Sequence, residues 1–423
     1  METVTISALG ALVGLVLSIV FIFMKISPVY SLMLGSFIGG IVGGATMMQT
    51  INIMVGGAAG MMTTILRILA AGILAGVLIN SGAADKIART VIDALGEKRA
   101  LLALSISTMI LTSVGVFIDI AVITVAPIAM AVAKQVGFSK KGILLAMVGG
   151  GKCGNMMSPN PNAIAVSSAF ELPLTTVMMA GILPAAVALI VVYILSNMVK
   201  NQGSEVTDKD LAVSVAVEDL PSFAASITGP VVAILALALR PLFGITIDPM
   251  IALPLGGIIG ALVMGKAKDI LDYSNKGLNS MTGVAIILIG TGTIAGVIQG
   301  SELGNLIINS VQGFGIPMFL LAPIAGILMS AATASTTSGS TVAAQVFGPT
   351  LTAAGVSKVA AASMIHCGAT VLDHLPHGSF YHATGGSVNM EFKERLSLVA
   401  YDSLIGLTLT AASVVFYGII GIF

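Results

Sequence analysis

The sequence predicts an all-α polytopic membrane protein built from two inverted-topology repeats, each with about five transmembrane helices, a re-entrant hairpin and a broken helix. Three observations predict this fold class. The 423 residues are 56% hydrophobic and only 9% charged, with a mean hydropathy of +1.04, whereas soluble domains carry about 25% charged residues. Two apolar segments are interrupted by polar residues. Landmarks of the first half recur in the second half at a nearly constant spacing.

Apolar segments divide the chain into elements, because a transmembrane helix needs about 20 such residues. In the first repeat, residues 1–199, the predicted spans lie near 4–24, 28–47, 62–80, 142–170 and 175–199. In the second repeat, residues 222–423, they lie near 222–243, 247–265, 282–299, 359–385 and 396–423. The polar residues 200–221 are interpreted as a cytoplasmic linker. The amphipathic stretch 83–99 is typical of an interfacial helix.

Two further stretches, 100–133 and 316–353, each consist of a pair of apolar arms around a polar tip. The tip of the first runs from Gly115 to Asp119, and the tip of the second from Ser335 to Thr341. We interpret both stretches as re-entrant hairpins. Two full spans in each stretch remain the alternative.

The two halves of the chain repeat one another. Pro28, Leu34, Gly35 and Gly44 recur 221 residues on as Pro249, Leu255, Gly256 and Gly265, and Cys153–Gly154 recurs 214 residues on as Cys367–Gly368. Five spans and a hairpin are an odd number, so the repeats are predicted to insert with opposite topology. Of the 19 Lys and Arg residues, 15 then fall on one face and 3 on the other. Because positively charged loops stay cytoplasmic, both termini are predicted to be periplasmic or extracellular.

Each half contains one apolar segment with a polar interruption: GGGKCGNMMSPNPN from Gly149 to Asn162, and IHCGATVLDHLPHG from Ile365 to Gly378. We expect the glycines at 149–151 and 154 to open the backbone of the first. Broken helices at corresponding positions of two halves mark the substrate site of many secondary transporters. The sequence therefore predicts that the broken helices over 142–170 and 359–385 face one another at a binding site.

Lys152 is the sharpest signal in the first interruption, since a lysine at the bilayer centre costs about 2.5–3.5 kcal/mol. It is either a functional cation, which meets a substrate carboxylate or carries a proton, or a structurally paired lysine. We interpret it as substrate-binding, with His366 at the equivalent place in the second half. Neighbouring polar and backbone groups suit a hydroxylated carboxylate and complete the predicted substrate site: Asn155, Ser158, Asn160, Asn162, Ser338, Gly339, Ser340 and Thr341.

Carboxyl and imidazole groups are the candidates for ion coupling. Asp119, at the tip of the first hairpin, is predicted to bind and release a proton, with a fixed ion pair to Lys152 as the alternative. Asp373, His374 and His377 form a second candidate group. All four histidines lie within the 17 residues 366–382, but no HExxH and no paired Cys-x-x-Cys occurs. A hydrogen-bonding cluster is therefore favoured over a metallohydrolase site, and neither a metal nor a cofactor is predicted.

Four motifs give the chain a resemblance to the gluconate:proton symporter (GntP) family of the ion transporter superfamily, over nearly its full length. They are the acidic hairpin 117–122 with Pro127, the Pro159-Asn-Pro161 interruption, the tip 339–343, and the segment 368–374 with 378–380. The chain differs from similar members by Asn160 and Asn162-Ala163 in the first interruption, by Pro376-His377 in the second, and by Lys152. These differences leave the carboxylate open.

The resemblance implies uptake of a small sugar acid or hydroxy acid by a homodimer, with an elevator-type movement of the hairpins and broken helices against scaffold spans 4–47 and 222–265. We therefore predict a proton-coupled symporter of a small organic anion in the bacterial inner membrane, and no enzymatic activity. The alternative is a sodium/proton antiporter without an organic substrate. The coupling ion is predicted to be a proton, with sodium as the other candidate, and no nucleic-acid partner is expected.

Overall fold

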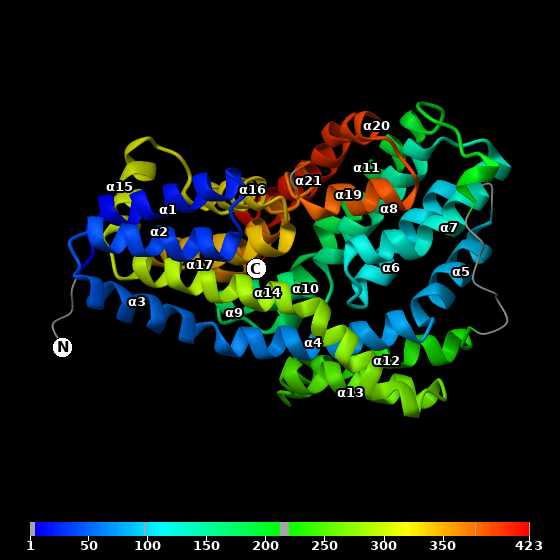
Figure 1. Ribbon diagram of the computed structural model, residues 1–423, viewed down its shortest axis with the longest axis horizontal. Coiled ribbons are helices and arrows are strands. Elements are labelled where there is room, and N and C mark those ends of the chain that lie inside the picture. The colour runs from blue at the N-terminus through cyan, green and yellow to red at the C-terminus, as the bar shows by residue number, and fades with distance from the viewer. Residues whose placement is uncertain (1–4, 97–98, 212–219, 377, 423) are drawn as a thin grey trace.

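The computed structural model describes residues 5–96, 99–211, 220–376 and 378–422, and every regular element within them is helical (Figure 1). The helices of the first half are α1 (Ala8–Phe23), α2 (Pro28–Val42), α3 (Met47–Gly60), α4 (Met62–Asn80), α5 (Ala83–Leu95), α6 (Ala100–Ser113), α7 (Ile118–Val136), α8 (Lys140–Met156), α9 (Pro161–Ala169), α10 (Leu174–Ala180) and α11 (Ile182–Val199). Those of the second half are α12 (Phe223–Phe243), α13 (Pro249–Val263), α14 (Ile270–Gln299), α15 (Leu303–Gly313), α16 (Leu321–Thr333), α17 (Thr336–Ala353), α18 (Lys358–Gly368), α19 (Ser379–Ser387), α20 (Phe392–Leu396) and α21 (Val399–Ser413).

Many of these helices are apolar enough to cross a bilayer. Within the described ranges, six helical runs have the required length and composition: Met47–Asn80, Ile118–Val136, Leu174–Val199, Phe223–Arg240, Ala267–Gln299 and Phe392–Ile419. Shorter apolar helices, among them α1, α2 and α13, accompany them. The all-helical prediction is confirmed.

Two helices begin much earlier than the sequence pattern indicated. The segment expected as a span over 62–80 belongs to a helical run of 34 residues from Met47 to Asn80, because Thr46 and Gln49 form a capping box that starts the helix there. The expected span 282–299 is the end of α14, which has 30 residues. Its polar first turns contain an ion pair of 2.8 Å between Asp272 and Lys276, a spacing that supports helix.

These two long elements cross in direct backbone contact. Gly57 of α3 lies against Gly292 and Gly296 of α14, and Gly72 and Gly76 of α4 lie against Gly277. Residue numbers rise along one helix as they fall along the other, so the two run antiparallel. A Cβ atom at these glycines would overlap the opposite backbone, which explains why small residues occupy the crossing.

The helix pair at the start of each half packs on the long helix of the other half. Helices α1 and α2 contact one another and α14, whereas α12 and α13 contact one another and α4. In Figure 1, α12 and α13 lie below α4 along the lower edge, and α1 and α2 lie at the upper left, near α15. The two halves are therefore interlocked through the long helices.

The first interruption begins later than expected. Helix α8 continues through the glycine run to Met156, so the chain is non-helical only over residues 157–160, before α9 begins at Pro161. The expectation that the glycines open the backbone is wrong. They serve close packing instead: a Cβ at Gly150 or Gly154 would overlap the backbone of α6. The second interruption lies between the end of α18 at Gly368 and the start of α19 at Ser379.

Both predicted hairpin stretches form two helices joined by a short turn. Helices α6 and α7 are separated by residues 114–117, and α16 and α17 by Ala334 and Ser335. Ser335 is the N-cap of α17, and its hydroxyl accepts a hydrogen bond of 3.2 Å from the Ser338 amide. The polar tip is therefore shorter than the sequence suggested, since Thr336 to Thr341 already lie in helix.

The described part of the linker, 200–211, is fastened to both halves. Lys140 at the start of α8 donates to Asp210 Oδ1 at 2.7 Å and to the Asn389 carbonyl at 3.0 Å, and Ser204 donates to Glu394. Burial alone would raise the pKa of Asp210, but hydrogen bonds from Lys140 and Thr207 outweigh it and hold this pKa well below the ordinary 3.8.

Candidate functional site

A cavity of about 340 Å³ lies where the two hairpin turns and the two interruptions meet. Its wall includes the start of α7, Asn155 and Asn162 on either side of the first interruption, the turn residues Ala334 and Ser335 with the first residues of α17, Asp373 of the second interruption, and the start of α19. Ser280 and Val284 of α14 close one side. The four segments singled out in the sequence therefore converge on one cavity.

Four helices begin at this cavity: α7, α9, α17 and α19. The first amide groups of a helix have no intrahelical acceptor and carry partial positive charge, so a helix start favours anions. Asn160 caps α9, since its Oδ1 accepts from the Ala163 amide at 2.9 Å. Among the described residues, no side chain caps α7 or α19. The electrostatic field of the backbone in the cavity therefore favours negative charge.

Hydroxyl and amide side chains join the two halves across the cavity. Thr337 at the start of α17 donates its hydroxyl to Asn162 Oδ1 at the start of α9. Thr336 donates to Asp373 Oδ2 at 2.5 Å. These contacts fix the second hairpin turn on both interruptions and leave polar atoms of each exposed to the cavity.

Two carboxyl groups, and no basic side chain, line the cavity within the part of the chain that the structure describes. Asp373 is paired with Lys152, whose Nζ lies 2.7 Å from Asp373 Oδ1. Asp119 takes part in no ion pair among the described residues, and the Ile120 amide donates to its Oδ1 at 3.0 Å. The lining therefore has one neutralised and one unpaired carboxyl group.

Lys152 lies behind Asp373 rather than on the cavity wall. Its side chain is completely buried (0% exposed), and Nζ also donates to the Thr370 carbonyl at 2.6 Å and contacts His374 Nδ1 at 3.0 Å. Of the readings considered for Lys152, this geometry matches the structural ion pair, formed with Asp373 and not with Asp119.

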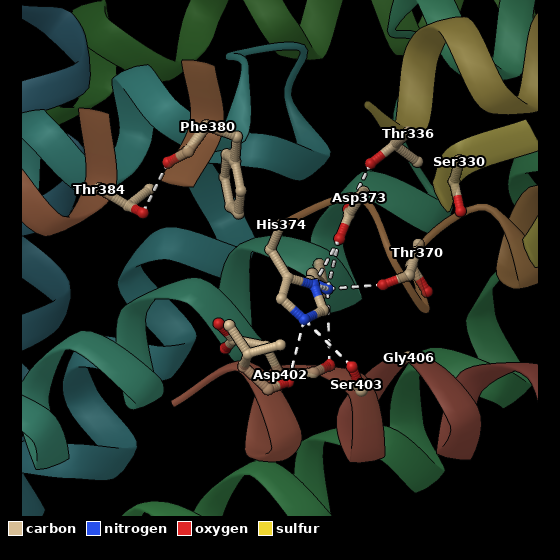
Figure 2. A network of polar contacts seen from close by, with 12 residues as sticks. Ser330, Thr336, Thr370, Asp373, His374, Phe380, Thr384, Asp402, Ser403 and Gly406 are labelled. Atoms are coloured by element: carbon tan, nitrogen blue, oxygen red, sulfur yellow. Dashed lines mark hydrogen bonds and ion pairs between the residues drawn. The ribbon is translucent and has the colours of Figure 1, made fainter. Parts of the chain in front are cut away.

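The polar network continues from His374 to α21. The Nδ1 atom of His374 lies 2.9 Å from Asp373 Oδ1. Its Nε2 atom lies 3.0 Å from the Val399 carbonyl oxygen and 3.1 Å from Ser403 Oγ. Figure 2 shows the imidazole between Asp373 on one side and the helix of Asp402 and Ser403 on the other. This network is continuous; it is buried from Lys152 to His374 and partly buried where His374 meets Val399 and Ser403.

A second buried ion pair adjoins this network. Arg395 donates to Asp402 Oδ2 at 2.6 Å, and both side chains are 1% exposed. Sequence reasoning missed these two residues, as well as Thr370 and Ser403, whereas Thr336 and Thr337 lie within the polar tip predicted from Ser335 to Thr341. Asp402 could have been found by the criterion applied to Asp119, because it is also a charged residue inside an apolar segment. Arg395 gives no such signal, because it falls between the predicted spans 359–385 and 396–423.

The remaining predicted residues lie outside the cavity lining. His366 is buried in α18, where its Nε2 has no hydrogen-bond partner in the described part of the chain. Ser158 is buried within the first interruption, and the four predicted tip residues are buried within α17: Ser338, Gly339, Ser340 and Thr341. His377 lies outside the described residues. No group of three or more His, Cys, Asp or Glu side chains that could hold a metal ion occurs in the described ranges.

Comparison with known proteins places the chain among transporters. The family model of the GntP family permeases matches residues 3–420. An uncharacterized transporter of Haemophilus influenzae is 57% identical over 415 residues, which cover 98% of this chain and 99% of that protein. A gluconate permease of Pseudomonas aeruginosa is 22% identical, over 95% of each chain.

The fold has counterparts among solved structures. The Neisseria gonorrhoeae protein MtrF, described as illuminating a class of antimetabolite efflux pumps, superposes with a TM-score of 0.65 over 95% of each chain at 12% identity. At this identity the likeness concerns the fold alone.

Proposed function

Because the chain belongs to the GntP permease family, we propose that it is a secondary transporter that carries a small organic anion together with protons across the bacterial inner membrane. The gluconate permease among its relatives supports a gluconate-like sugar acid or another hydroxycarboxylate as the substrate class. The observation that carries the proposal is the cavity of about 340 Å³ at which four helices begin.

The cavity has the chemistry of a site for a hydroxylated carboxylate. Its volume lies in the range of small-molecule sites, about 300–1,000 Å³. Helix starts supply partial positive charge for the carboxylate without a basic side chain. The amides of Asn155 and Asn162 and the hydroxyls of Thr337 and Ser379 supply donors and acceptors for substrate hydroxyl groups.

Asp119 supplies the link to protons in this proposal. Two like charges 4 Å apart repel by about 4 kcal/mol at an effective dielectric constant of about 20. An anion in the cavity therefore binds much better when the unpaired carboxyl of Asp119 is protonated, so anion and proton bind together. Asp373 and His374, as a buried pair with Lys152, form the second candidate group for ion coupling.

An inverted repeat is the topology that we propose. What supports it is the antiparallel crossing of α3–α4 with α14, in which the contact of Gly57 with Gly296 has a counterpart in the contact of Gly277 with Gly76. Each residue of one contact is related to a residue of the other by 220 positions. Such paired contacts are what a pseudo-two-fold axis between two inverted halves produces.

Labelling from one side of the membrane tests this topology. Cys153 and Cys367 are both buried, so a cysteine introduced at the exposed Lys25, or at the exposed Thr246 at the equivalent place 221 residues on, reports on its own side. The inverted arrangement predicts that K25C reacts from the cytoplasm and T246C from the periplasm. Reaction of both from the same side contradicts it.

The cycle that we propose is an elevator-type movement of a homodimer, in which the hairpins α6–α7 and α16–α17 and both interruptions move against α1–α2 and α12–α13. This part rests on the family resemblance. It requires that the anion binds with different affinity in the outward-open and inward-open states.

Uptake by reconstituted protein tests the function. We expect purified protein in proteoliposomes to take up a sugar acid or hydroxy acid, with alkalinisation of the external medium that depends on the anion. The variant Thr337→Val should weaken uptake, because it removes the hydroxyl between the two halves, whereas Thr282→Val on the exposed side of α14 is the matched control. A sodium-driven pH change without any anion would support the antiporter instead.

A further inference from the structure

Lys152 makes more contacts than an ion pair with Asp373 requires. Its Nζ lies 2.6 Å from the Thr370 carbonyl oxygen and 2.7 Å from Asp373 Oδ1. His374 Nδ1 follows at 3.0 Å and the Asp402 carbonyl oxygen at 3.5 Å. The charge therefore comes from α8 in the first half, whereas each of these acceptors belongs to the second half.

These acceptors are of the kind that binds a small monovalent cation. Thr370 follows the end of α18, where carbonyl groups lack intrahelical donors and the helix dipole is negative. In secondary transporters, unwound backbone carbonyls and half-helix C-terminal ends coordinate sodium ions. The carboxylate of Asp373 adds a full negative charge. The second interruption thus forms an oxygen-rich anionic site around the ammonium group of Lys152.

We propose that Lys152 is a built-in cation: its ammonium group fills a monovalent-cation site of the second interruption, so that no sodium ion from solution is needed there. The role of Lys152 in a transport cycle rests on the proposed function, whereas the cation site itself does not. The ammonium group gives Asp373 a fixed partner and leaves Asp119 as the group that exchanges a proton when the anion binds.

Removal of the ammonium group tests the inference. Lys152→Ala opens space beside Asp373 and Thr370, whereas Lys152→Met fills that space with an apolar chain of similar length. The thermal midpoint of each purified variant is measured in choline chloride and in the chlorides of sodium, lithium and ammonium at the same ionic strength. At about 100 mM, we expect at least one of the small cations to raise the midpoint of the Ala variant by several degrees, because a ligand that binds only the folded state stabilises it.

Three controls make the outcome decisive. The native protein and the Met variant should show the same midpoint in all four salts. The double variant Lys152→Ala/Asp373→Asn should lose the response, because it lacks the carboxylate. An Ala variant that gains nothing from any small cation, whether it is folded or aggregated, overturns the inference, as does a native protein stabilised by sodium. The assay contains no organic anion, so a failure to find uptake would refute the proposed function and leave this site standing.

Discussion

Replacing Lys152 by Met leaves the Asp373 carboxylate buried without its cation. Both side chains are inaccessible, at 0% and 3% exposure, and their charged atoms are 2.7 Å apart. Removing one partner of such a pair costs about 3–5 kcal/mol, because the remaining charge keeps its desolvation penalty. Met has a similar volume, and a swap that conserves volume adds less than about 1.5 kcal/mol. We therefore expect Lys152→Met to destabilise the fold by about 3–5 kcal/mol.

A second substitution should relieve most of this loss. Asp373→Asn replaces the carboxylate by an amide that can still accept the Thr336 hydroxyl, which lies 2.5 Å from Oδ2. In the double variant Lys152→Met/Asp373→Asn neither charge remains, so the double variant should be more stable than Lys152→Met alone. A coupling free energy of about 2–3 kcal/mol is expected between the two positions.

The assay is equilibrium unfolding of the native protein and the three variants in mixed micelles at one pH, with helical circular dichroism as the signal. The four free energies of unfolding give the coupling energy directly. Additive losses, with a coupling energy below about 0.5 kcal/mol, would show that Lys152 and Asp373 do not neutralise one another. The description of the cavity as having one unpaired carboxyl group would then be wrong.

Three further outcomes are expected. Asp119→Asn should bind the anion and take it up with little dependence on external pH, which uptake at several pH values measures. Gly277→Ala should destabilise by about 1–3 kcal/mol, because its Cβ overlaps the backbone of α4, whereas Gly283→Ala on the same helix meets nothing within 4 Å and is the control for thermal unfolding. Because the pKa of Asp210 is held below 3.8, the stabilisation from its pair with Lys140 is complete above about pH 4 and is lost as the pH falls through the lowered value. Asp210→Asn should therefore flatten the acid limb of a stability–pH curve.

The sequence predicted which segments form the site better than it predicted the side-chain contacts within the site. Composition identified the membrane helices, and the polar interruptions predicted at 149–162 and 365–378 marked the segments that meet at the cavity. Asp119, Asn155, Asn162 and Asp373 line it as a group. These residues stand out in a one-dimensional pattern because each is polar or charged within an apolar segment.

Other parts of the site depend on directions that spacing does not contain. The side chain of Lys152 could point into the cavity or pair with Asp373 behind the cavity wall. The position and rotation of α8 against the second half determine which of these occurs. The glycines at 149–151 gave a misleading signal, since glycine is used both where a helix breaks and where two helices approach closely. The start of α14 was missed because its first turns are polar, and hydropathy does not detect a polar helix.

At the crossing of the long helices the two backbones are in direct contact. No side chains lie between them there that could change rotamer to allow movement. If one helix slid along the other, carbonyl oxygens would overlap Cα atoms, so α3–α4 and α14 should move together as one rigid unit. If the cavity is to open alternately to the two sides of the membrane, the chain has to bend beyond the ends of this unit. Gly82, with a φ of 78° between α4 and α5, and residues 300–302, between α14 and α15, lie just beyond those ends.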